Sequence, residues 1–189
     1  DQARSLDAQD TLADNRQEFQ LSEGKIYLDG NSLGALPTGV MKRMEEVIAK
    51  QWGKDLITSW NAHAWIDLPE KVGQKIALLL GAAPGQVICC DSISVNIHKL
   101  LCCALHLRPG RQKILAPEDS FPTDLYMVQG LAQLLGPQAV TLVTVAEKDL
   151  VEAIDEQVAA VLFSHVNYKT RSEEHTSELQ SPCNLVCRL

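Results

Sequence analysis

From residue 85 to residue 163, short apolar segments alternate regularly with longer amphipathic ones, and this alternation constrains the fold more than any other feature. The apolar segments, which predict strands, are residues 86–90, 112–116, 139–145 and 159–163. The amphipathic segments, which predict helices, are residues 94–106, 122–135 and 147–157. Strands that are separated by helices form a parallel sheet whose faces the helices cover. We therefore expect an α/β fold with a mostly parallel sheet and helices on both faces.

The first 84 residues show a weaker pattern. A short strand is predicted at residues 25–28, followed by a turn-rich loop at residues 29–34. Thr38 can cap a helix whose apolar residues recur at helical spacing, and a second helix is predicted from Pro69 to the residue before Gly81. We divide the chain into an N-terminal segment (1–40), the first part of a large domain (41–170) and a tail (171–189).

The tail does not continue the pattern. Residues 171–181 have neither helical nor strand periodicity, and they resemble the conceptual translation of a sequencing-adapter oligonucleotide. We therefore interpret residues 171–189 as foreign and exclude them from the fold prediction.

Composition excludes several classes of function. The chain has 189 residues, of which 46% are hydrophobic, and its formal net charge of -7 argues against binding to nucleic acid or to an anionic membrane. It has no apolar run long enough to span a membrane and no signal-peptide pattern, so we expect a cytoplasmic protein. Four cysteines form two adjacent pairs, at 89–90 and 102–103, a spacing that favours buried apolar residues over metal ligands. No metal site is expected.

Two polar clusters follow predicted strands and open predicted helices. Ser92 and Ser94 stand where a helix exposes free N–H groups, so they can bind an anion such as a phosphate, or Ser92 or Ser94 can simply cap the helix. The segment 121–124 reads Phe-Pro-Thr-Asp, and its Phe121 can cover an aromatic ring while Asp124 holds a ring nitrogen protonated. With a phosphate pocket, these are the parts of a pyridoxal phosphate site. The alternative is that this segment is only a helix start.

A third polar cluster follows the last predicted strand. Ser164, His165, Asn167 and Tyr168 come directly after an apolar segment, and we expect them either to face solvent or to line a pocket. Because the carboxyl ends of the strands in such a sheet form the usual ligand-binding edge, all of these clusters point to one small-molecule site.

Taken together, the motifs resemble those of the kynureninase family, most closely its bacterial form, over nearly all of residues 6–170. They are Tyr27-Leu28-Asp29-Gly30-Asn31-Ser32-Leu33-Gly34, Asp91-Ser92-Ile93-Ser94-Val95-Asn96, Phe121-Pro122-Thr123-Asp124 and Val161-Leu162-Phe163-Ser164-His165-Val166-Asn167-Tyr168-Lys169-Thr170.

The resemblance implies an enzyme of fold type I that uses pyridoxal 5'-phosphate. Such an enzyme is a homodimer with its sites at the subunit interface, and it hydrolyses L-kynurenine to anthranilate and L-alanine in tryptophan catabolism and NAD biosynthesis. The cofactor-binding residues that the resemblance assigns are Ile93, Ser94, Phe121, Pro122, Thr123, Asp124 and Ser164. Of these, Ile93 and Ser94 would meet the phosphate, and Phe121 would stack on the ring. Ser32 would lie near the substrate.

The Schiff-base lysine of the family is not among these residues. The resemblance places it beyond residue 170, and Lys99, Lys113 and Lys169 do not match its position. We therefore expect an N-terminal fragment that is inactive by itself, and we assign no catalytic residue. The sequence does not distinguish kynurenine from 3-hydroxykynurenine as the substrate. Alternatives are another fold-type I enzyme of the class V aminotransferase or cysteine desulfurase type, or a truncated fragment without function.

Overall fold

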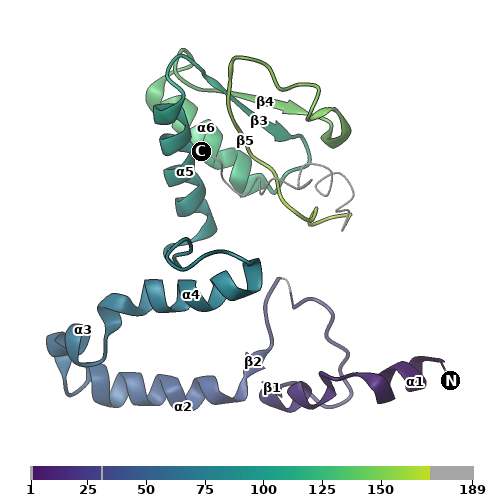
Figure 1. The fold of residues 1–189 in the computed structure, drawn as a ribbon, viewed down its shortest axis with the longest axis vertical. Helices are drawn as coiled ribbons and strands as arrows, with labels where there is room; N and C mark the ends of the chain where they lie inside the picture. The colour runs from purple at the N-terminus through teal and green to yellow at the C-terminus, as the bar shows by residue number, and fades with distance from the viewer. Residues whose placement is uncertain (1, 31, 171–189) are drawn as a thin grey trace. The chain divides into compact units, whose positions relative to one another are not determined.

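The computed structural model describes residues 2–30 and 32–170, so the tail interpreted as foreign lies outside the described residues. The chain divides between Cys89 and Cys90 into two compact units. Figure 1 shows the helices and strands of both. We describe each unit separately, beginning with the second because it contains the sheet.

The second unit is built on a parallel sheet of three strands. They are β3 (Lys113–Pro117), β4 (Thr141–Val145) and β5 (Val158–Val161), in the spatial order β4-β3-β5. Both pairings are parallel. Ile114 and Leu115 in the central strand are 0% and 1% exposed, as expected where a strand is covered on both faces. The predicted α/β class and the predicted parallel sheet are confirmed.

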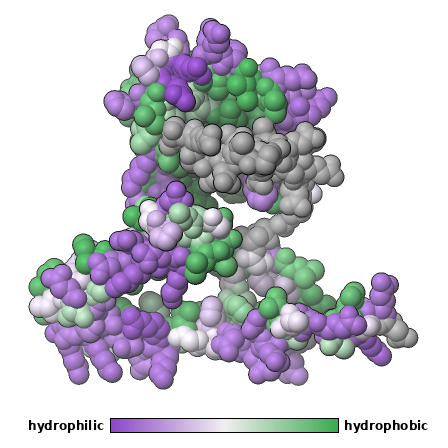
Figure 2. Space-filling view, in the orientation of Figure 1, coloured by the Kyte–Doolittle hydropathy of each residue, from purple (hydrophilic) through white to green (hydrophobic). Residues whose placement is uncertain are grey.

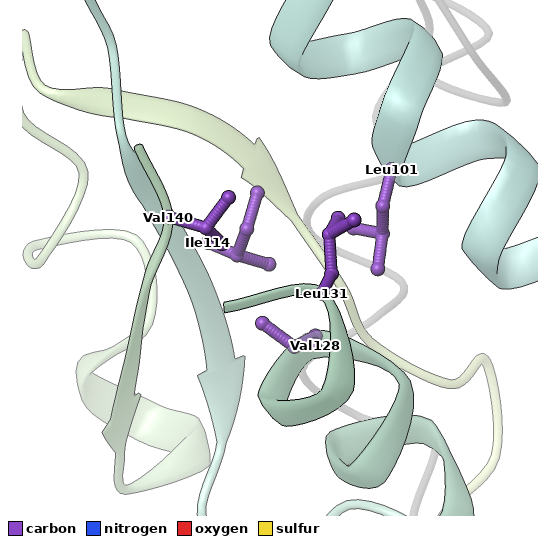
Figure 3. Packing of buried hydrophobic residues seen from close by; sticks show 5 residues of the cluster. All are labelled: Leu101, Ile114, Val128, Leu131 and Val140. Atoms are coloured by element: carbon purple, nitrogen blue, oxygen red, sulfur yellow. The ribbon is translucent and has the colours of Figure 1, made fainter. Parts of the chain in front are cut away.

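Two helices cover one face of this sheet. They are α5 (Ile93–Leu107) and α6 (Pro122–Leu135), close to the predicted bounds. Ser92 caps α5, because its Oγ accepts a hydrogen bond from the N–H of Val95, and Gly136, with φ +89°, follows the end of α6. Figure 3 shows the resulting core, in which side chains of both helices meet the sheet. Its buried members are Leu101, Ile114, Val128, Leu131 and Val140.

The other face of the sheet is covered differently. Leu115 and Val158 pack there against Leu150, which follows the short 3-10 helix η5 (Glu147–Asp149). The helix predicted at residues 147–157 is therefore wrong in type and length. Near the end of that segment, the Asp155 carboxylate accepts from the N–H of Gln157 at 2.8 Å and pairs with Lys113 Nζ at 2.6 Å. Side chains that bond to nearby backbone in this way compete with helical hydrogen bonds.

The first unit consists mainly of helices. Its elements are α1 (Gln2–Gln9), η1 (Ala13–Glu18), β1 (Phe19–Gln20), β2 (Leu36–Pro37), α2 (Thr38–Glu46), η2 (Val47–Trp52), η3 (Leu56–Thr58), α3 (Ser59–Ala62), η4 (Trp65–Asp67) and α4 (Leu68–Leu80). The two short strands pair in antiparallel orientation, and η2 continues α2 as a π-helix. The helices predicted from Thr38 and from Pro69 are confirmed, and Gly81 ends α4 with φ +66°. The predicted cap is wrong, since Pro37 takes the N-cap position and Thr38 is the first residue of α2.

Two predicted strands of the first unit are not formed. Residues 25–28 and 86–90 are without regular structure, and Ile26 and Ile88 are 85% and 65% exposed. Residues 86–90 instead run along α4, where the N–H of Cys89 donates to the carbonyl of Pro69 at 3.0 Å. Gly73 permits this approach, since a Cβ there would stand 2.1 Å from the carbonyl oxygen of Val87. The backbone thus packs on a helix and not in a sheet.

Apolar side chains remain on the surface of the first unit. Figure 2 shows hydrophobic residues there, intermixed with hydrophilic ones. Leu78 and Leu79, at the end of α4, are 83% and 87% exposed. The expectation of buried cysteines is also wrong, since Cys89 of this unit and Cys102 and Cys103 of the second unit are exposed free thiols. Among the residues that the structure describes, no helix is long and apolar enough to cross a membrane.

Candidate functional site

A small pocket opens at the carboxyl edge of the sheet, where the segments that follow β3 and β5 meet. Backbone hydrogen bonds hold the strand ends together. The N–H of Leu162, after β5, donates to the carbonyl of Leu115 in β3 at 2.8 Å, and the N–H of Glu118, after β3, donates to the carbonyl of Val145 in β4 at 2.9 Å. The lining residues are Pro117, Asp119, Ser120, Phe121, Glu147, Ser164, Asn167 and Tyr168. The pocket thus lies where an open α/β sheet ordinarily binds its ligand.

Asn167 connects the two sides of this pocket. Its side-chain amide is largely buried, with 9% of the residue exposed, and Nδ2 donates to Asp119 Oδ2 at 2.6 Å. Its Oδ1 accepts from the N–H groups of Lys169 and Thr170, at 2.9 Å and 3.1 Å. One side chain therefore folds the segment after β5 into a turn and links that turn to the loop after β3.

Two aromatic rings form part of the wall. Phe121 and Tyr168 lie edge to face, with ring centroids 5.0 Å apart and planes inclined by 72°. This arrangement is the preferred one for aromatic pairs. Phe121 is still 44% exposed, so part of its ring remains open to a ligand.

The hydroxyl of Ser120 is buried at this pocket without a partner. Its Oγ has no hydrogen bond, although a serine hydroxyl can both donate and accept. Buried polar groups are nearly always paired, and an unpaired one costs about 1 to 3 kcal/mol. The pocket holds about 20 Å³, which is space for a single water molecule. Ser120 is thus a polar group that a small ligand or a water could satisfy.

The N-terminus of α5 is held in an unusual backbone conformation. Asp91, just before the cap, has φ +50°, a value that costs free energy for any residue other than glycine. Lys99, two turns into the helix, forms an ion pair with its carboxylate, and Asn96 Nδ2 donates to the carbonyl of Cys90 at 2.8 Å. The hydrogen bond between Lys99 and Asp91 lowers the pKa of Asp91. The same hydrogen bond raises the pKa of Lys99.

These contacts hold the start of α5 at a fixed position. Ser94 lies in the first turn and is half-buried, and Ile93 is 74% exposed. Figure 1 shows α5 and α6 side by side. Since α6 runs back from the end of β3 and α5 ends before β3 begins, both helices start at the carboxyl edge of the sheet. The free N–H groups of α5 therefore face the same edge as the pocket.

Asp124 lies in the first turn of α6 and is half-buried. Burial raises the pKa of its carboxyl above the usual 3.8. A partly desolvated carboxylate interacts more strongly with a nearby cation than one in bulk water. Asp124 is therefore suited to pair with a positively charged group of a ligand.

The structure thus brings together some of the predicted residues. Phe121 and Ser164 line one pocket, and Pro122, Thr123 and Asp124 continue from it into α6. Ser94 and Ile93 lie at the start of α5 and outside the pocket lining. Ser32 belongs to the first unit, where its Oγ donates to Asp29 at 2.8 Å.

Four lining residues were not singled out from the sequence, and one of them, Pro117, is the last residue of β3. Asp119 and Ser120 precede Phe121 directly, so their position after a strand was the available signal. Glu147 comes from the segment after β4, and nothing in its local sequence distinguishes it from the other acidic residues there.

Comparisons with known proteins identify relatives of this chain. It is 48% identical to "Kynureninase" of Pseudomonas fluorescens over 171 residues, which is 88% of this chain and 41% of the relative. It is 43% identical to "Kynureninase" of Burkholderia pseudomallei over 175 residues, 90% of this chain and 42% of the relative. The chain therefore spans about two fifths of the length of these curated relatives. No protein-family model matches the chain.

Proposed function

We propose that this chain, which belongs to the kynureninase family, supplies part of the pyridoxal phosphate site of an enzyme that hydrolyses L-kynurenine to anthranilate and L-alanine. The observation that carries the proposal is the pocket at the carboxyl edge of the sheet. Phe121 and Ser164 both line this pocket. The resemblance assigns both to the cofactor, although they belong to motifs more than 40 residues apart in the sequence.

The described residues fit the chemistry of this cofactor. The start of α5 offers Ser94 Oγ and free backbone N–H groups, which favour a phosphate. Phe121 offers an open aromatic face and Asp124 a carboxylate. Ser120 Oγ at the pocket has no hydrogen-bond partner, and this supports the proposal because a bound ligand would supply one. Ile93, Ser94, Phe121, Pro122, Thr123, Asp124 and Ser164 would hold the group.

When bound, pyridoxal phosphate supplies an electron-accepting ring that stabilises negative charge at the α-carbon of an amino acid. The residues of this chain prepare the site for that chemistry. Asp124 stabilises a proton on the ring nitrogen, because its ionised carboxylate is the complementary charge in a half-buried position. Phe121 fixes the plane of the ring, and Ser94 anchors the phosphate end. No lysine of the chain is assigned to covalent attachment.

The finer properties are part of the same proposal. We propose a cytoplasmic homodimer in the complete protein, acting in tryptophan catabolism and NAD biosynthesis, with L-kynurenine or its 3-hydroxy form as the substrate. The family relationship supports these points. The incomplete large domain of fold type I would comprise residues 41–170, in agreement with the parallel sheet of the second unit.

A binding experiment tests the cofactor assignment. The purified chain is titrated with pyridoxal 5'-phosphate and, in parallel, with pyridoxal, and the absorbance spectrum is recorded before and after dialysis. We expect reversible binding that requires the phosphate and weakens in Ser94→Ala and Phe121→Ala. Equal binding of pyridoxal would contradict the phosphate site, and a band that survives dialysis would contradict the absence of a covalent lysine.

An activity experiment tests the reaction. The coding sequence is read past the codon for Thr170, expressed in full and incubated with L-kynurenine, and the fluorescence of anthranilate is followed. Production of anthranilate supports the proposal. Release of sulfur from cysteine without cleavage of kynurenine would replace it with a cysteine desulfurase activity.

A further inference from the structure

We propose that Asn167 is a positioning residue, which holds Tyr168 against Phe121 so that the Phe121 ring is oriented for the cofactor before the cofactor binds. The inference rests on the proposed function of the pocket. It goes beyond that function because it assigns the orientation of the ring to a residue from a different segment of the chain.

Phe121 does not orient itself. It precedes Pro122 at the N-terminal boundary of α6, and it is 44% exposed. A side chain at a helix boundary with that exposure has little packing from its own helix to select one rotamer. The aromatic contact that the structure gives it is the edge-to-face packing with Tyr168 at 5.0 Å.

The position of Tyr168 in turn depends on Asn167. Tyr168 is 38% exposed and lies in the turn after β5. That turn is closed by Asn167 Oδ1, which accepts from the N–H groups of Lys169 and Thr170, on the far side of Tyr168 in the sequence. The backbone on both sides of Tyr168 is therefore tied to one side chain.

Asn167 is itself tied to the loop that carries Phe121. Asn167 Nδ2 donates to Asp119 Oδ2 at 2.6 Å, two residues before Phe121. Hydrogen bonds to a charged acceptor are about twice as strong as neutral ones. The amide therefore sets the distance between the two loops, and the two aromatic rings meet as a consequence.

The chemistry of the Asp119–Asn167 pair permits a reciprocal exchange. Asn167→Asp removes the donor of this hydrogen bond and places a second carboxylate next to that of Asp119, so the two side chains repel each other. In the double variant Asp119→Asn with Asn167→Asp, the new amide at 119 donates to the new carboxylate at 167. That carboxylate still accepts from the N–H groups of Lys169 and Thr170. The exchange thus reverses donor and acceptor in the bond between positions 119 and 167, and it keeps the direction of the two bonds from the backbone.

The experiment compares the wild-type chain, Asn167→Asp, the exchanged double variant and Asp155→Asn. The last is a matched control, since Asp155 pairs with Lys113 at the opposite, amino end of β3 in the same unit. Two quantities are measured well below the unfolding temperature of each protein: the nuclear Overhauser effect between the rings of Phe121 and Tyr168, and the dissociation constant for pyridoxal 5'-phosphate.

We expect Asn167→Asp to lose the ring-to-ring signal and to bind the cofactor about tenfold more weakly, the size of a typical coupling between contacting residues. The exchanged variant should recover both, and Asp155→Asn should change neither. Recovery in the exchanged variant separates positioning from a general loss of structure, even if Asn167→Asp itself folds poorly.

Two results would overturn the inference while leaving the proposed function intact. One is a ring-to-ring signal that persists in Asn167→Asp, and the other is unchanged cofactor affinity after the signal is lost. A wild-type chain that shows the signal but does not bind pyridoxal 5'-phosphate would contradict the proposed function, and the inference with it.

Discussion

The two units of this chain differ in how they bury apolar side chains. Of the eleven buried hydrophobic residues among those described, ten belong to the second unit, and Ala77 alone belongs to the first. Both units contain amphipathic helices, but only the second contains a sheet of more than two strands. The difference shows that helical periodicity alone does not produce a core.

The apolar face of α2 and of η2, which continues it, illustrates this point. Val40, Met44 and Ile48 recur at helical spacing, yet they are 38%, 51% and 51% exposed. In the second unit, Val128 and Leu131 of α6 have the same kind of spacing and are almost fully buried, because the sheet lies under them. Burial of each such side chain contributes about 1.5 to 3 kcal/mol, so the second unit should carry most of the stability of the chain.

Polar contacts dominate the interior of the first unit. Gln51 and Ser59 are 3% and 0% exposed, and Ser59 Oγ donates to the carbonyl of Gln51. Gln51 Oε1 also accepts from Trp65 Nε1 at 2.7 Å. These bonds define local geometry, but each contributes only about 0.5 to 1.5 kcal/mol net.

The largest expected effect breaks the core of the second unit. Ile114→Ala removes a side chain that is 0% exposed, and we expect it to lower the free energy of unfolding by about 2 to 5 kcal/mol, since it leaves a cavity. Urea unfolding followed by circular dichroism measures the loss. Ile26→Ala in the first unit is the matched control, because Ile26 is 85% exposed, and its effect should stay within about 0.5 kcal/mol. Equal losses would remove the contrast between the units.

The next effect concerns two helical glycines. Gly73→Ala in α4 forces a Cβ to within 2.1 Å of the Val87 carbonyl oxygen, and we expect destabilisation by about 1 to 3 kcal/mol. Hydrogen exchange at the amide of Cys89, which bonds to Pro69, should accelerate. Gly130→Ala in α6 meets no atom within 4 Å and should stabilise the chain by about 0.5 to 1 kcal/mol. The same sign for both substitutions would show that residues 86–90 do not pack on α4 in solution.

A smaller effect distinguishes two buried hydroxyl groups. Ser59→Ala in the first unit removes the donor of the hydrogen bond to the carbonyl of Gln51, so it should lower the free energy of unfolding by about 1 kcal/mol. Ser120→Ala in the second unit removes a hydroxyl without a partner, so it should be neutral or stabilise by up to about 1 kcal/mol. Thermal unfolding of the two variants side by side measures the difference. Destabilisation by Ser120→Ala would mean that its hydroxyl is satisfied in the free chain.

The smallest expected effect depends on pH. Because the pKa of Asp124 is raised in the folded state, its protonated form favours folding at low pH. That contribution is lost as the pH rises through the folded pKa, so the ionised carboxylate costs stability at neutral pH. Asp124→Asn should therefore stabilise the chain at pH 7 by less than about 0.5 kcal/mol. Unfolding at pH 7 and at pH 3 tests this, and a stabilisation that is larger at pH 3 would contradict the sign.

The sequence predicted a helix or strand correctly where its apolar residues recur at a single spacing and its ends are marked by capping or turn residues. Helices α4, α5 and α6 have apolar residues at helical spacing, and their bounds were predicted within about two residues. Gly81 marks the end of α4 and Ser92 the start of α5, while Pro122 and Gly136 mark the start and the end of α6. Strands β3, β4 and β5 were recognisable as apolar segments between them. These features are local, and local chemistry is visible in a single sequence.

It failed where the outcome depended on a distant partner. Residues 86–90 are as apolar as β3, but they pack on α4 through Gly73 and do not join the sheet. Asp155 lies near the end of the segment that was predicted to be a helix, and its partner Lys113 lies 42 residues away. Neither contact has a signal in the local sequence.

The candidate site divides in the same way. The sequence alone indicated which polar and aromatic residues follow the strands. It also identified Phe121, Asp124 and Ser164 as candidate cofactor-binding residues. The link from Asn167 to Asp119 spans 48 residues, and the pocket that it closes exists only because β3 and β5 are neighbours in the sheet.

The amino-acid sequence by itself therefore determined the α/β class, the helices with marked ends and the chemical character of the site. Only the tertiary structure decided which apolar segments became strands, which serine was left without a partner and which two rings came into contact. The physical reason is that period and capping are properties of neighbouring residues. Pairing and burial, in contrast, are settled by which segments the folded chain brings side by side.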